Sequence, residues 1–110
     1  MQQEYYMTQI PLWITEADVV SLINVPQAID ALERILPMEA REEAANMKKG
    51  VLMVGENDAM HVLGASVAGA GLCGFKTWVN IRGQSSTVVV LFSLENGACE
   101  AVIEATALGQ

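Results

Sequence analysis

Basic residues are scarce in this 110-residue chain, which has 6 Lys and Arg against 13 Asp and Glu and a net charge of −7. The densest basic cluster is the pair Lys48-Lys49. Because nucleic-acid-binding surfaces carry clustered positive charge, this composition excludes a nucleic-acid partner. Apolar runs are also short, and none approaches the roughly 20 residues of a membrane-spanning helix. No membrane association is therefore expected.

Targeting and metal-binding signals are absent too. Residues 1–6 have neither a basic start nor an apolar stretch, so no secretory signal is seen. The two cysteines, Cys73 and Cys99, lack metal-ligand spacing, and His61 is the single histidine. We expect free thiols, a cytoplasmic protein and no metal site. His61 is expected on the solvent side of a strand.

Hydrophobic residues are abundant, at 52%, while charged residues make up 17%. Such an apolar composition indicates surface that another chain or domain covers. The length suits one domain, which we place at residues 10–110 after a flexible extension at 1–9. Open strand edges and apolar surface together favour a homodimer of twofold symmetry.

The first half of the domain predicts helices. After a possible edge strand at 12–14, Thr15 and Asp18 form a capping-box pattern that starts a short helix ending at Asn24. A second helix begins at Pro26. Pro37 predicts a kink or break, and a further helical segment is expected from Met38 to Met47.

The second half predicts strands. Hairpins are expected for 51–54 with 60–65, and for 87–94 with 98–103 across Glu95-Asn96-Gly97. Between them lie a buried strand at 74–81 and a polar loop at 83–86. Helices followed by about five or six strands, without βαβ alternation, indicate an α+β fold with a largely antiparallel sheet.

Lys76 stands in the strand GFKTWVNI among Phe75, Trp78, Val79 and Ile81. An ammonium group buried there requires an anion beside it, unless the side chain extends far enough to place the ammonium in water at the sheet edge. The residues alone leave two interpretations open. In the first, Lys76 has a purely structural role: its ammonium pairs with a neighbouring Asp or Glu, or its side chain extends to the sheet edge. In the second, the ammonium binds the carboxylate of a ligand.

The segment GAGLCG at 69–74 satisfies the letters of the dinucleotide fingerprint G-x-G-x-x-G. That fingerprint works only between a strand and a helix, with an acidic residue about 20 positions later. Here the segment leads directly into the strand at 74–81. We interpret it as a glycine-rich loop and expect no cofactor site in this chain.

Three stretches resemble the ornithine cyclodeaminase/mu-crystallin family. They are PLWITEADVVSLINVPQAIDALERIL, GFKTWVNI and TVVVLFSLENGACEAVIEATAL, in the family's order and spacing from about Ile10 to Gln110. The resemblance implies the family's N-terminal domain, which binds substrate and dimerises through its sheet. The family's second, Rossmann domain holds NAD or NADP, and this chain resembles only the first.

The resemblance assigns three substrate-binding candidates and no catalytic residue. Lys76 matches the family lysine that contacts the substrate carboxylate. Lys49, or Lys48, stands near a family arginine and keeps its charge without the bidentate fork. Gln84 stands about where a family threonine lies. Glu104 resembles an acidic position near the site, or else caps a helix that starts there.

The functional hypothesis is a dimerisation and small-carboxylate-binding module that is not catalytic alone. The chain resembles the family up to the point where a substrate-binding arginine motif would follow, which indicates a domain cut before that motif. Two alternatives stay open. The chain is part of an NAD(P)-dependent cyclodeaminase or amino-acid dehydrogenase, or it is a non-functional remnant.

Overall fold

A seven-stranded mixed sheet forms the centre of residues 10–109, the part of the chain that this computed structural model describes. The strand order is β1-β7-β6-β5-β4-β2, with β3 also paired to β4. Its strands are β1 (Leu12–Ile14), β2 (Ala44–Asn46), β3 (Gly50–Val54), β4 (Asp58–Val67), β5 (Leu72–Ile81), β6 (Gln84–Ser93) and β7 (Cys99–Glu104).

All neighbouring pairs are antiparallel except β1 with β7, so the predicted α+β class and largely antiparallel sheet are confirmed. The sheet has one strand more than the highest number expected. The predicted extension at 1–9 and the end of the predicted domain at Gln110 lie outside the described residues. No helix of the described residues is long and apolar enough to cross a membrane.

The helix α2 (Glu16–Leu22) begins where the sequence predicts it. Thr15 accepts a hydrogen bond from the backbone N–H of Asp18, and the Asp18 carboxylate accepts the N–H of Thr15, which completes the capping box. Such reciprocal bonds satisfy two backbone donors that a helix start would otherwise leave unpaired. The edge strand predicted at 12–14 is β1.

The helix α3 (Val25–Ala40) runs through Pro37 without a break. Pro37 lies in the last turn, so the hydrogen bond that its missing N–H would make is lost close to the helix end. The predicted helical segment at 38–47 is wrong beyond Ala40. Glu42 has φ 60°, and the chain turns there into β2, which pairs with β4. Pairing with an open strand edge overrides the helix-favouring composition of this stretch.

Both predicted hairpins are confirmed, as β3–β4 and β6–β7. The connection between β5 and β6 is tighter than expected. It has only two residues, Arg82 and Gly83, with φ of 52° and 77°. Gln84 to Ser86, expected in a loop, therefore belong to β6. Successive positive φ angles are typical of the turn that matches the twist of a two-residue hairpin.

The sheet has two faces, which the strand register defines. Lys76, Trp78 and Asn80 share one face with His61 of β4 and Val89 of β6, and we call this the lysine face. Phe75, Thr77 and Val79 point to the other, which we call the opposite face. Alternating side chains of a strand point to alternate faces, so one register assigns every strand.

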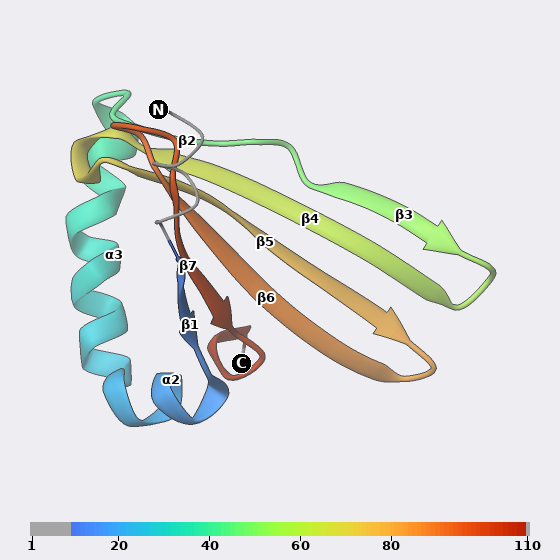
Figure 1. Cartoon of the computed structure of the whole chain (residues 1–110). Coiled ribbons are helices and arrows are strands. Elements are labelled where there is room, and N and C mark those ends of the chain that lie inside the picture. The colour runs from blue at the N-terminus through green and yellow to red at the C-terminus, as the bar shows by residue number, and fades with distance from the viewer. Residues whose placement is uncertain (1–9, 110) are drawn as a thin grey trace, which may run out of the picture.

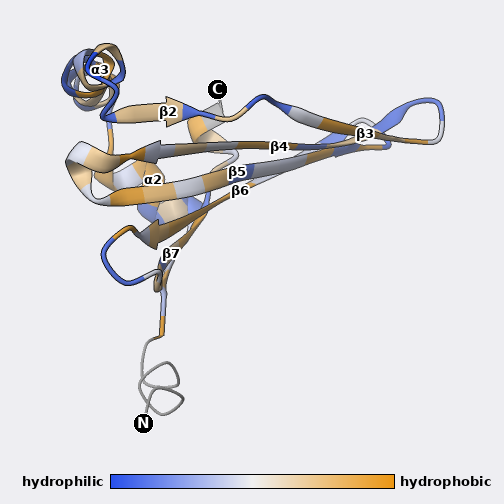
Figure 2. Ribbon diagram, turned by 90° about the horizontal axis from the view of Figure 1, so that it is seen from above, coloured by the Kyte–Doolittle hydropathy of each residue, from blue (hydrophilic) through white to orange (hydrophobic). Residues whose placement is uncertain are grey.

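The helices cover only one end of this sheet. Figure 1 shows α2 and α3 together at that end, while the β3–β4 and β5–β6 hairpins extend away from both. Seen from above in Figure 2, apolar stretches of these strands lie without a helix over them. The described residues include no large side chain that is fully buried. Leu52 is 62% exposed, Leu32 of α3 57% and Phe75 44%.

The strand that carries Lys76 was expected to be buried, and this is wrong. Lys76, Trp78 and Val79 are only half-buried, and Phe75 is exposed. The reason is the single sheet layer, because a strand in the middle of a sheet is buried only when both faces are covered. Among residues 10–109, no helix packs broadly on the opposite face of β5, where Phe75 is 44% exposed.

Candidate functional site

Two lysines meet at one aromatic ring on the lysine face. The ammonium of Lys76 lies 4.8 Å from the ring centroid of Trp78, and that of Lys49 lies 5.1 Å from it. Lys76 and Trp78 are two residues apart in β5, whereas Lys49 comes from the segment before β3. A lysine over a tryptophan ring gains about 0.5–1 kcal/mol at an exposed site. Both ammonium groups therefore lie close to the same ring.

Neither lysine has a carboxylate partner in the described part of the chain. The ion pairs there join Arg34 to Asp30 and Arg41 to Glu43. The interpretation of Lys76 as the partner of a neighbouring Asp or Glu is therefore wrong for residues 10–109. Two ammonium groups beside one aromatic ring, with no carboxylate of residues 10–109 at ion-pair distance, make a surface that attracts an anion.

His61 completes the cluster. Its ring stacks on Trp78 with centroids 4.7 Å apart and an angle of 8° between the planes. The Nε2 atom of His61 lies 3.1 Å from the Asn80 amide nitrogen, and the Ser85 hydroxyl donates to the Asn80 oxygen. Asn80 thus donates to Nε2, which leaves the proton of a neutral ring on Nδ1. Nδ1 is buried and has no partner among the described residues.

The expected solvent-facing position of His61 is therefore wrong. The register pairs His61 with Trp78, so both side chains emerge on the lysine face, where their rings cover each other. The signal that was missed is the alternation along β5. Positions 76, 78 and 80 share one face of a strand, and this places Trp78 and Asn80 beside Lys76.

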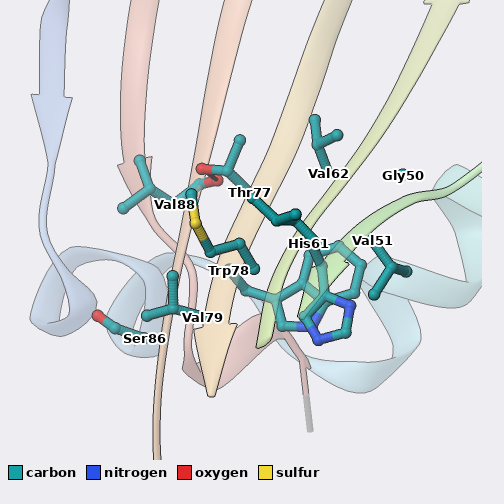
Figure 3. Close-up of a pocket in the computed structure, with 11 residues that line it drawn as sticks. Gly50, Val51, His61, Val62, Thr77, Trp78, Val79, Ser86 and Val88 are labelled. Atoms are coloured by element: carbon teal, nitrogen blue, oxygen red, sulfur yellow. Dashed lines mark hydrogen bonds between the residues drawn. The ribbon is translucent and has the colours of Figure 1, made fainter. Parts of the chain in front are cut away.

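A pocket of about 590 Å³ lies along the middle of β3 to β6. Its side chains are mostly apolar and include Leu52, Met60 and Val79 of the opposite face. Figure 3 shows His61 and Trp78 with their rings against each other at one side of this pocket. The pocket extends the apolar opposite face, and its lining residues in the described part of the chain include no Lys, Arg, Asp or Glu.

Gln84 stands apart from the two lysines. It is the first residue of β6 and pairs with Ile81, whereas Lys76 pairs with Val89. Five residues along a strand correspond to about 16 Å. The structure therefore brings together Lys49 and Lys76, but it places Gln84 at the far end of the β5–β6 hairpin.

Glu104 is tied to α2. Its carboxylate accepts hydrogen bonds from Trp13 Nε1 at 2.8 Å and from the Glu16 N–H at 3.0 Å. The hydrogen bond from Trp13, and to a lesser extent that from Glu16, holds the pKa of Glu104 below its usual value. Glu104 ends β7 and does not cap a helix of its own. Within the described residues, the element after it is the short 3₁₀ turn η2 (Ala107–Gly109).

The glycine segment 69–74 does not have the geometry of a dinucleotide phosphate site. The glycine segment follows β4, forms the 3₁₀ turn η1 (Ala68–Ala70) and enters β5 through Gly71, whose φ is 70°. A dinucleotide phosphate site needs a helix N-terminus after its glycines. A strand stands in that place here, so the interpretation of the segment as a loop leading into a strand is confirmed.

Comparison with known proteins finds solved structures of similar fold. No protein-family model and no curated protein matches the sequence. Among solved structures, a probable ornithine cyclodeaminase from Bordetella pertussis Tohama I is similar, with 27% identity and a TM-score of 0.84 over 91% of this chain. An archaeal alanine dehydrogenase dimer with bound NAD shows 26% identity and a TM-score of 0.80 over 89% of this chain.

A third structure, the iminosuccinate reductase of Paracoccus denitrificans in complex with NAD⁺, shares the fold at 20% identity and a TM-score of 0.84 over 91% of this chain. The chain spans only about a third of the length of these proteins, 32% to 34%. Residues 10–109 thus have the fold of one part of ornithine cyclodeaminase-like and NAD-dependent reductase structures.

Proposed function

We propose that this chain is a small-carboxylate-binding and dimerisation module, similar to the N-terminal domain of ornithine cyclodeaminase-like enzymes, and that it does not catalyse a reaction alone. The observation that carries the proposal is the meeting of Lys49 and Lys76 over Trp78 without an acidic partner in the described residues. Both lysines are positions that the family resemblance assigns to the substrate.

Lys76 makes the main contact in this proposal. The Lys76 residue as a whole is half-buried, and an electrostatic attraction to a carboxylate is stronger at such a position than in bulk solvent. Trp78 limits the positions of both lysine side chains, which lowers the entropy lost when they bind the anion. Lys49 is exposed and adds a second, more strongly screened charge.

Homodimerisation is the second part of the proposal. Because residues 10–109 fully bury no large side chain, they leave much of the available hydrophobic stabilisation unused. The apolar opposite face, with Leu52, Met60 and Phe75 exposed, is suited to pack against the same face of a second copy. Cys73 and Cys99 are free thiols, in keeping with the cytoplasmic location that we propose.

An alternative function is that of one part of an NAD(P)-dependent enzyme. The observation that favours it is the coverage, since the chain matches about a third of each similar structure and two of those carry NAD. Hydride transfer requires the nicotinamide to be held against the substrate. The residues described here would then supply the substrate contact, and a separate region the cofactor site. A non-functional remnant is the third hypothesis, and it would bind no ligand.

Calorimetric titration with acetate, glycine and pyruvate tests the proposal. We expect the wild type to bind at least one of them, with at least a tenfold loss in Lys76→Ala. Lys48→Ala is the matched control, because Lys48 is exposed and neighbours Lys49 but makes no contact with Trp78 that would hold it in the site. Equal affinities of wild type and Lys76→Ala would refute the role of Lys76. NADH binding by this chain would refute the absence of a cofactor site.

A further inference from the structure

A second cavity, of about 360 Å³, opens on the lysine face between α3 and the sheet. Ile35 of α3 lines it from one side, and Leu63, Val89 and Leu91 line it from the sheet. Gly74, also in the lining, has no room for a side chain, since a Cβ atom there would lie 2.9 Å from Leu91 Cδ2 and 2.5 Å from the Val90 carbonyl oxygen. The volume is within the range of small-molecule sites.

Lys76 connects this cavity to the cationic cluster. Among the described residues that line it, Lys76 is the single charged one, and Asn46 supplies the single side-chain amide. Lys76 lines the cavity, and its ammonium lies 4.8 Å from the Trp78 centroid. An apolar cavity with a few polar groups at one place is the usual construction of a site that fixes the orientation of its ligand.

From this arrangement we propose that the ligand is a small carboxylate with an aliphatic substituent and without a second positive charge. The carboxylate binds the Lys76 ammonium, and the substituent enters the cavity below α3. This inference rests on the proposed function and names its substrate class. A diamino acid such as ornithine is disfavoured, because none of the described residues that line the cavity is acidic and could receive its side-chain ammonium.

Burial of the substituent explains why the cavity stays apolar. Each methylene group that moves from water into such a cavity makes the free energy of binding more favourable and lowers the dissociation constant about fourfold. The gain is available only if the carboxylate holds the molecule in one orientation, with its chain toward Ile35. Both parts of the ligand are therefore required for tight binding.

The test measures dissociation constants for the full chain with acetate, butanoate and hexanoate, and with the pair norvaline and ornithine. Norvaline has the carbon skeleton of ornithine without the second amine. We expect affinity to rise about fourfold per methylene along the acid series and norvaline to bind more tightly than ornithine. Hexan-1-ol, which lacks the charge, is expected to bind more weakly than hexanoate.

Two variants locate the binding. Ala65→Leu adds a side chain to the cavity lining and is expected to remove the gain with chain length while leaving acetate binding unchanged. Ala40→Leu makes the same change at an exposed position outside the cavity and is expected to have no effect.

The outcomes separate the two proposals. If acetate binds through Lys76 but affinity does not rise with chain length, this inference is refuted and the proposed function stands. If no carboxylate binds, both are refuted. If Ala65→Leu alters only the oligomeric state, the cavity receives a side chain of a second copy, and this inference is refuted as well.

Discussion

Glu16 and Glu104, 88 residues apart, each accept backbone hydrogen bonds from the other's segment. Glu104 accepts the N–H of Glu16 at 3.0 Å, and Glu16 accepts the N–H groups of Thr106 at 2.6 Å and Ala107 at 3.0 Å. The start of α2 is thereby joined to the end of β7. Carboxylates at such sites stabilise donors that would otherwise lack partners.

This relationship predicts an acid-sensitive contribution to stability. The pKa of Glu104 is lower in the folded state, so its stabilisation is complete above the unfolded pKa of about 4.3 and is lost as pH falls through the lowered folded value. We expect Glu104→Gln to unfold at lower urea concentration than wild type at pH 7. The difference should shrink as pH falls below about 4.

Glu100→Gln is the matched control, because Glu100 is an exposed residue of the same strand. It should show no comparable difference from wild type at either pH. If the difference in urea midpoint between Glu104→Gln and wild type stays constant from pH 7 to pH 3, the charge of Glu104 contributes nothing to stability.

Trp78 is predicted to organise the two lysines. Trp78→Leu removes the ring that lies under both ammonium groups, and we expect carboxylate affinity to fall about twofold to fivefold, the equivalent of one cation–π contact. The loss should be smaller than that in Lys76→Ala. Calorimetric titration measures both. Trp13→Phe is the control, since Trp13 bonds to Glu104 and lies away from the lysines, and it should bind the ligand like wild type.

Phe75 is predicted to lie in a dimer interface on the opposite face. It is 44% exposed and packs edge-to-face on Phe92, with centroids 6.4 Å apart. Phe75→Glu places a charge on this face in both copies, so we expect a monomer at concentrations where the wild type is a dimer. Light scattering after size-exclusion chromatography reports the mass. Leu32→Glu, at an exposed apolar position of α3, should stay dimeric, and dissociation of both variants alike would argue against this interface.

The β5–β6 turn predicts a stabilising substitution. Arg82 has φ 52°, a region that asparagine occupies at lower cost than arginine. Arg82→Asn should raise the free energy of unfolding by about 0.5–1 kcal/mol, because Asn-Gly is the preferred pair for this turn. The N–H of residue 82 can still donate to Asp58 Oδ1. Gly83→Ala, at φ 77°, should have the opposite effect in the same urea titration.

Local signals in the sequence predicted the elements that depend on neighbouring residues. Thr15 and Asp18 started α2, and Asn96-Gly97 marked the β6–β7 turn, because capping and turn preferences involve residues only a few positions apart. The apolar composition likewise indicated surface to be covered. Residues that are exposed on both α3 and the opposite face agree with that expectation.

Long-range pairing decided what those signals missed. The stretch at 44–46 has the composition of a helix but forms β2, because the edge of β4 offers it hydrogen bonds from residues about 20 positions later. For the same reason the sequence predicted a solvent-facing His61, whereas the structure stacks its ring on Trp78. The surroundings of His61 depend on the register between β4 and β5.

The lysine site shows the same division. The sequence by itself determined that Lys76 stands on a strand and that its family resemblance points to a carboxylate. Only the tertiary structure decided that Lys49 reaches the same Trp78 ring, that His61 covers it, and that α3 closes an apolar cavity beside it. Each of these contacts joins residues of different elements, so no window of neighbouring letters contains them.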